Sequence, residues 1–168
     1  MVNSITKDEL AVMPRETFEG RIIVVQSEQE AIKAISYLST FKAIGFDTET
    51  RPAFKKGVSH QVALMQLSTE DTCFLFRLNI IGFPDCLAEI LVNPAIKKIG
   101  LSLKDDFSAM HKRSLLVPSN FIDLQSFVKK KEYRKDNACR TGKPILSLML
   151  RRCMRLSMHG HVLEYLMN

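Results

Sequence analysis

Two acidic side chains two positions apart, Asp47 and Glu49, follow a run of apolar residues in the segment KAIGFDTETRP (residues 42–52). A strand alternates its faces, so both carboxylates should point the same way, with Thr48 opposite. Two carboxylates at so short a distance repel each other unless a cation lies between them. Mg²⁺ and Mn²⁺ accept such oxygen ligands. The pair is compatible with a divalent-metal site, but by itself it favours the simpler interpretation, in which Asp47 ends its strand and Glu49 caps the following turn.

A second acidic pair, Asp105 and Asp106, lies in IKKIGLSLKDDFSAM (residues 96–110), where a strand is expected to end near Ser102 and a helix to begin. Acids in a first helical turn are common simply because they complement the helix dipole. In an α/β sheet, however, ligands bind at the carboxyl ends of the strands. The two acidic segments could therefore belong to one site.

The elements that would position these acids alternate along the chain. Ser27 and Glu30 have capping-box spacing ahead of a helical apolar repeat, and the short Glu70-Asp71 break predicts an antiparallel hairpin. The expected helices are residues 27–41, 84–93 and 104–114, and the expected strands are residues 21–27, 42–47, 61–69, 72–78 and 95–102, with 119–127 as a strand or the start of a helix. This order predicts an α/β fold, a mixed sheet flanked by helices.

The composition fits one globular domain. The chain has 168 residues, 46% of them hydrophobic, and its four cysteines lack metal-ligand spacing. The net charge of +6 is uneven: residues 1–128 hold 14 Lys and Arg against 15 Asp and Glu, whereas residues 129–168 hold 10 against 3. The basic character belongs to the last forty residues and does not by itself indicate a nucleic-acid surface. With no signal peptide or membrane span evident in the sequence, we expect a cytoplasmic protein with no membrane partner.

Taken together, IGFDTET, VALMQLST and KKIGLSLKDDFSAM resemble the first two motifs of the DEDD 3′–5′ exonucleases, of the DEDDy type, in the branch that contains ribonuclease D and Werner-type exonuclease domains. In that family the first motif is DxE, and the second places an aspartate six residues after a glycine, with apolar residues one and four positions beyond. Gly100 and Asp106 have that spacing, and Phe107 and Met110 fill the apolar positions. The resemblance leaves Asp105 as a neighbouring acid.

The resemblance implies a ribonuclease-H-like fold and hydrolysis of nucleic acid, RNA or DNA, from a 3′ end with two Mg²⁺ or Mn²⁺ ions. Asp47 would bridge the ions, Glu49 would bind the first ion and position the attacking water, and Asp106 would bind the second. Thr48 would contact the terminal nucleotide through its backbone. Gln66 would lie beside the site and bind substrate, although a sheet hydrogen bond explains it at least as well.

The third motif of the family, YxxxD on a late helix, is missing, which leaves the C-terminal part incomplete and predicts impaired or absent activity. The only tyrosine after residue 133 is Tyr165, and no acid lies four residues beyond it. We divide the chain into a leader (1–20), an exonuclease-like domain (21–128) and an atypical basic tail (129–168).

Two other functions remain open. A non-catalytic nucleic-acid-binding or interaction module could keep the same scaffold with incomplete metal ligands. A phosphatase with an aspartyl nucleophile in a DxDxT motif is disfavoured, because Glu49 stands where the second aspartate is required.

A shifted reading frame explains the tail. When the third base of each codon is read with the first two of the next, Met158-His159 can only encode Ala, and residues 153–165 can encode YAAxDAWACLRI, which resembles the third motif. We infer a deletion near residues 128–131 and predict that the gene's codons spell this motif in the shifted frame. Sequencing the gene tests this, and codons that cannot encode the motif would refute it.

Overall fold

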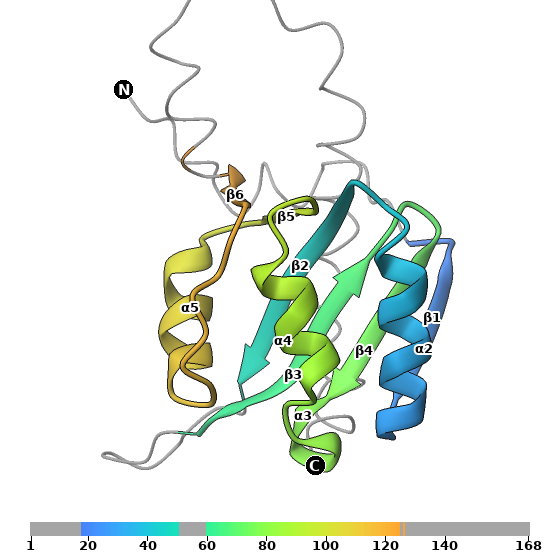
Figure 1. Cartoon of the computed structure of the whole chain (residues 1–168), viewed down its shortest axis with the longest axis horizontal. Helices are drawn as coiled ribbons and strands as arrows, with labels where there is room; N and C mark the ends of the chain where they lie inside the picture. Colours follow the sequence, from blue (N-terminus) through green and yellow to red (C-terminus); the bar gives the residue numbers. More distant parts are fainter. Residues whose placement is uncertain (1–17, 51–59, 125, 127–168) are drawn as a thin grey trace, which may run out of the picture.

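A six-stranded mixed sheet organises the part of the chain that the computed structural model describes, which is residues 18–50, 60–124 and 126 (Figure 1). Its strand order is β1-β4-β3-β2-β5-β6. The strands are β1 (Arg21–Val25), β2 (Ala43–Thr50), β3 (Val62–Ser68), β4 (Thr72–Arg77), β5 (Lys97–Gly100) and β6 (Phe121–Asp123). The helices are α2 (Glu28–Leu38), α3 (Leu78–Ile81), α4 (Asp85–Val92) and α5 (Leu103–His111).

The topology confirms the predicted mixed sheet. Strands β3 and β4 form the expected antiparallel hairpin, and β2 is antiparallel to β3. Strand β1 runs parallel to β4, and β2, β5 and β6 are mutually parallel in that order. Consequently β2, β4 and β5 all end at the same edge of the sheet, which is where the acidic residues were expected.

Local hydrogen bonds account for the shifted boundaries. Strand β1 stops at Val25 because the backbone N–H groups of Gln26 and Ser27 donate to the Glu30 carboxylate, at 2.8 and 3.1 Å, and complete the predicted capping box of α2. Helix α5 stops at His111, earlier than predicted. In segment 119–127 the strand β6 takes only Phe121–Asp123, and Leu124 is already helical, so both predicted alternatives are present. The one-turn helix α3 was not predicted.

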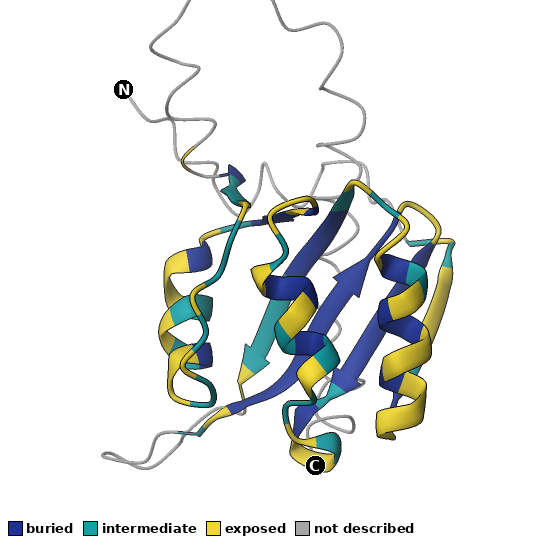
Figure 2. Cartoon of the chain, viewed as in Figure 1, coloured by how far each residue is buried: buried dark blue, intermediate teal, exposed yellow. Residues whose placement is uncertain are grey.

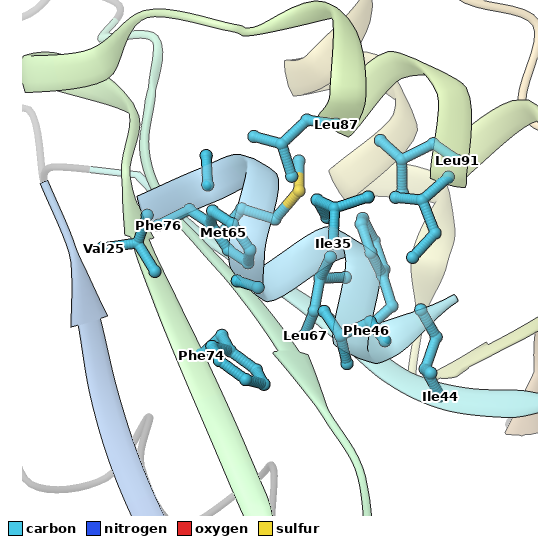
Figure 3. Close-up of a cluster of buried hydrophobic side chains, with 14 of the residues drawn as sticks. Val25, Ile35, Ile44, Phe46, Met65, Leu67, Phe74, Phe76, Leu87 and Leu91 are labelled. Atoms are coloured by element: carbon cyan, nitrogen blue, oxygen red, sulfur yellow. The ribbon is translucent and has the colours of Figure 1, made fainter. Parts of the chain in front are cut away.

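The core lies between the sheet and α2, α4 and α5, which cover one face (Figure 1). Alternate strand residues point into it, among them Phe46 of β2, Met65 and Leu67 of β3 and Phe74 and Phe76 of β4 (Figure 3). All seven residues of β3 are nevertheless buried, so side chains on the opposite face are also removed from water (Figure 2). A strand buried on both faces explains why VALMQLS reads as a nearly continuous apolar run.

Two groups of predictions fall outside this description. The leader before Phe18 and the tail from residue 127 onward, with its proposed frame shift, lie outside the described residues. Within the described residues, no helix is long and apolar enough to cross a membrane.

Gly100, the last residue of β5, has no room for a side chain. A Cβ atom added there would lie 2.7 Å from the carbonyl oxygen of Phe46 and would also collide with the Leu103 side chain. Only a residue without a side chain lets β5 approach β2 this closely while α5 folds back at once. The glycine therefore brings the helix that carries Asp106 against the strand that carries Asp47.

Replacing Gly100 with alanine should destabilise the fold by about 1–3 kcal/mol, because the overpacked methyl group must displace backbone. Chemical denaturation measures this change in the free energy of unfolding. Ser108→Ala, at an exposed position of α5, serves as the control and should change stability by less than about 0.5 kcal/mol. Equal stability of the two variants would contradict the close approach.

Candidate active site

The site forms where β2 extends beyond the end of the neighbouring strand β5. Residues Ala43 to Gly45 pair with β5, whereas the last part of β2, from Phe46 to Thr50, pairs only with β3. Helix α5 follows β5 through Ser102, whose backbone has a left-handed φ of 58° and whose N–H donates to the Asp123 carboxylate at 3.1 Å. This turn sends α5 along the uncovered edge of β2, so Asp106 comes to lie beside the acidic end of that strand.

Three aromatic rings hold this arrangement together. Phe46 precedes Asp47 and Phe107 follows Asp106, and both rings pack edge-on against Phe121 of β6, each with ring centroids 5.0 Å apart. Edge-to-face pairs of this kind add about 0.5–1.5 kcal/mol each beyond the area they bury. The residues next to the two carboxylates are therefore tied to one shared ring.

A buried lysine also lies against the Phe121 ring. The Lys98 side chain is fully buried, its Nζ donates to the Asn93 carbonyl oxygen at 2.7 Å, and it lies 5.2 Å from the centroid of Phe121. Burial lowers its pKa to about 8. Because its charge faces the end of α4 and an aromatic ring, Lys98 has a structural role here.

Thr48 connects the two acidic segments directly. Its backbone N–H donates to Asp47 Oδ1 at 3.0 Å, and its hydroxyl donates to Asp106 Oδ1 across 58 positions of sequence. The predicted alternation of β2 is consistent with this contact, since Thr48 points to the same face as the core residue Phe46, on the side where α5 packs. The role of the Thr48 side chain was not predicted from the sequence; a hydroxyl between two acids was the available signal.

The pKa shifts of Asp47 and Asp106 are those expected for half-buried carboxylates of like charge that lie near one another. The pKa of Asp47 rises from its ordinary 3.8 to about 7, first because burial penalises the charged form and then because Asp106 and Glu49 repel it. Burial also raises the pKa of Asp106, against hydrogen bonds from Thr48, and the charge of Glu49 adds to the rise. Both charges that act on Asp47 are negative, so a bound cation would relieve the repulsion.

The structure separates the predicted residues into two groups. Asp47, Glu49 and Asp106 are half-buried and interact electrostatically, whereas Asp105 is exposed. Gln66 lies directly opposite Asp47 in the β2–β3 register and is 1% exposed, and its side chain makes no hydrogen bond in the described part of the chain. The sheet hydrogen bond considered for Gln66 is therefore not present.

The candidate metal ligands Asp47, Glu49 and Asp106 all offer carboxylate oxygens, which is the ligand type that a hard divalent cation prefers. Among residues 18–50 and 60–124, however, no three His, Cys, Asp or Glu side chains converge closely enough to hold a metal ion. In the same part of the chain, Asp106 accepts a hydrogen bond from the Thr48 hydroxyl.

Comparison with known proteins agrees with the fold and the motifs. A family model described as 3′–5′ exonuclease matches residues 22–150, which is more than half of the chain. The chain therefore belongs to the 3′–5′ exonuclease family, as the resemblance predicted, and solved exonuclease structures share its fold.

Individual relatives cover parts of the chain. The mouse bifunctional 3′–5′ exonuclease/ATP-dependent helicase WRN is 38% identical over 71 residues, which is 41% of this chain and 5% of that protein. The EXD2 exonuclease domain superposes with a TM-score of 0.59 at 24% identity, covering 68% of this chain and 61% of the other, and was also solved after soaking in Mg and GMP. Trypanosoma brucei RNase D in complex with RNA U12 gives a TM-score of 0.58 at 20% identity over 66% of this chain and 40% of the other.

The raised pKa of Asp47 makes a prediction about stability and pH. The folded protein keeps a proton on Asp47 up to about pH 7, whereas the unfolded chain loses it near pH 4. The stability that this proton contributes is complete below pH 4 and is lost as the pH rises to about 7. Without divalent metal, Asp47→Asn should therefore match the parent near pH 4 and exceed it at pH 8 by on the order of 2 kcal/mol, allowing for partial exposure of the site.

Thermal or urea unfolding in the presence of a chelator measures this difference across pH 4 to 8. Asp105→Asn, at an exposed acidic position of α5, is the control and should not reproduce the gain in stability at pH 8. A parent-like pH dependence in the Asp47→Asn variant would contradict the electrostatic description of the site.

Proposed function

We propose that this protein hydrolyses phosphodiester bonds at the 3′ end of a nucleic acid with Mg²⁺ or Mn²⁺ as cofactor. The observation that carries the proposal is the meeting of Asp47 and Asp106, from a strand and a helix far apart in sequence, at the end of the sheet and with a like-charge interaction between them. Membership of the exonuclease family supports the choice of reaction.

In this proposal Asp47, Glu49 and Asp106 hold the cations, and two ions are expected. Bound ions of this kind supply a Lewis acid for the phosphodiester and lower the pKa of a coordinated water. Glu49 would position the attacking water, and Thr48 would orient both aspartates through the hydrogen bonds that it already donates. The backbone of Thr48 would contact the terminal nucleotide.

The substrate class and location are further parts of the proposal. The Trypanosoma brucei RNase D structure holds RNA and the EXD2 domain was soaked with GMP, so a nucleic-acid strand with a free 3′ end is the class we propose here. The chain would act in the cytoplasm. Because the third motif is absent from the sequence, we propose that this copy is impaired relative to its relatives.

A second function has one observation in its favour. Since no three potential metal ligands converge in the described ranges, and Asp106 is hydrogen-bonded to Thr48, the scaffold would also suit a module that binds nucleic acid without cleaving it. The same assay separates the two functions.

The test is an exonuclease assay with 5′-labelled single-stranded RNA and DNA oligonucleotides and Mn²⁺, with the full chain. We expect slow shortening from the 3′ end that chelation abolishes and that Asp47→Ala reduces by about 100-fold or more, because a metal ligand is lost. Asp105→Ala is the matched control and should cleave like the parent. Activity that survives Asp47→Ala would refute the site, and oligonucleotide binding without cleavage would favour the second function.

A further inference from the structure

Gln66 is a buried polar side chain on the face of the sheet that carries Asp47, and its polar atoms have no partner in the described part of the chain. It is 1% exposed, and neither its amide nitrogen nor its amide oxygen has a hydrogen-bond partner. The β2–β3 register places it directly opposite Asp47. Directly opposed residues on one face have Cβ atoms about 4.5–5.5 Å apart, so the amide lies within reach of that carboxylate.

The surroundings of Gln66 offer no stabilising reason for an amide. Its neighbour across the other strand pair is Leu75, and Leu64 lies two positions before it on the same face; both leucines are buried. A buried amide without partners destabilises a fold, and a leucine or methionine of similar volume would fill the position without that cost. The amide at this position therefore needs an explanation other than packing.

We propose that Gln66 is a positioning residue whose amide nitrogen donates a hydrogen bond to the Asp47 carboxylate when the site holds its divalent cation; this inference rests on the proposed function. Asp47 Oδ1 already accepts the Thr48 N–H, so a second donor would fix the rotation of the carboxylate. Residues that orient metal ligands in this way typically change metal affinity 10- to 100-fold when they are lost.

The chemistry of an amide suits this position better than that of a charged donor. A lysine or arginine opposite Asp47 would neutralise the carboxylate and compete with the cation, whereas an amide orients it and leaves its charge available. Because Gln66 is almost fully buried, it acts through Asp47 and not on the nucleic acid.

The experiment is a calorimetric titration of Mn²⁺ into the metal-stripped full chain, comparing the parent with Gln66→Met. We expect Mn²⁺ binding to weaken about tenfold or more, while the metal-free unfolding midpoint stays the same or rises because an unpartnered amide has been removed. Leu75→Met is the matched control: it conserves volume in the adjacent position on the same face and should leave the Mn²⁺ affinity within about twofold of the parent.

The outcomes separate this inference from the proposed function. Parent-like Mn²⁺ affinity in a folded Gln66→Met variant overturns the positioning role. A folded parent that binds no Mn²⁺ overturns the metal-dependent function itself. Gln66→Leu, which matches the neighbouring leucines, provides a second comparison if Gln66→Met lowers the metal-free midpoint, and the same loss of Mn²⁺ affinity is expected of it.

Discussion

The repulsion between Asp47 and Asp106 is the constraint that the described structure must overcome. Two half-buried carboxylates with a third nearby would move apart in a flexible chain. The pKa of Asp47 is raised first by burial and then by the repulsion of Asp106 and Glu49. The opposing contributions come from neutral groups, namely the Thr48 hydrogen bonds and the shared contact of Phe46 and Phe107 with Phe121. A fold that holds like charges together in this way is prepared for a cation.

The sheet determines how these groups can meet. Because β2 continues beyond β5, its last residues have an edge without a neighbouring strand, and α5 occupies that edge immediately after the turn at Ser102. Gly100 makes the turn possible by allowing β5 and β2 to approach without a side chain between them. The six-residue spacing from Gly100 to Asp106 therefore separates the point where β5 and β2 come closest from the acidic residue on α5.

Much of the fold was predictable because its local signals were strong. The capping box at Ser27 located α2, and the short break at Glu70 and Asp71 predicted the β3–β4 hairpin. Helix α3 was missed because a single turn has no repeat to detect. The burial of both faces of β3 conceals period-two alternation, so the sequence did not indicate that Gln66 would lie unpartnered among leucines.

The sequence by itself determined the type and spacing of the chemical groups: Asp47 and Glu49 two apart in a strand, and Asp106 six residues after a glycine. These features depend on local backbone geometry, which a short segment encodes. Only the tertiary structure decided that the Thr48 hydroxyl reaches Asp106, that Phe121 joins the two acidic segments, and that Gln66 faces Asp47 without a partner of its own. Those relations join residues from different strands and helices, and they exist only once strand register and helix packing bring distant parts of the chain together.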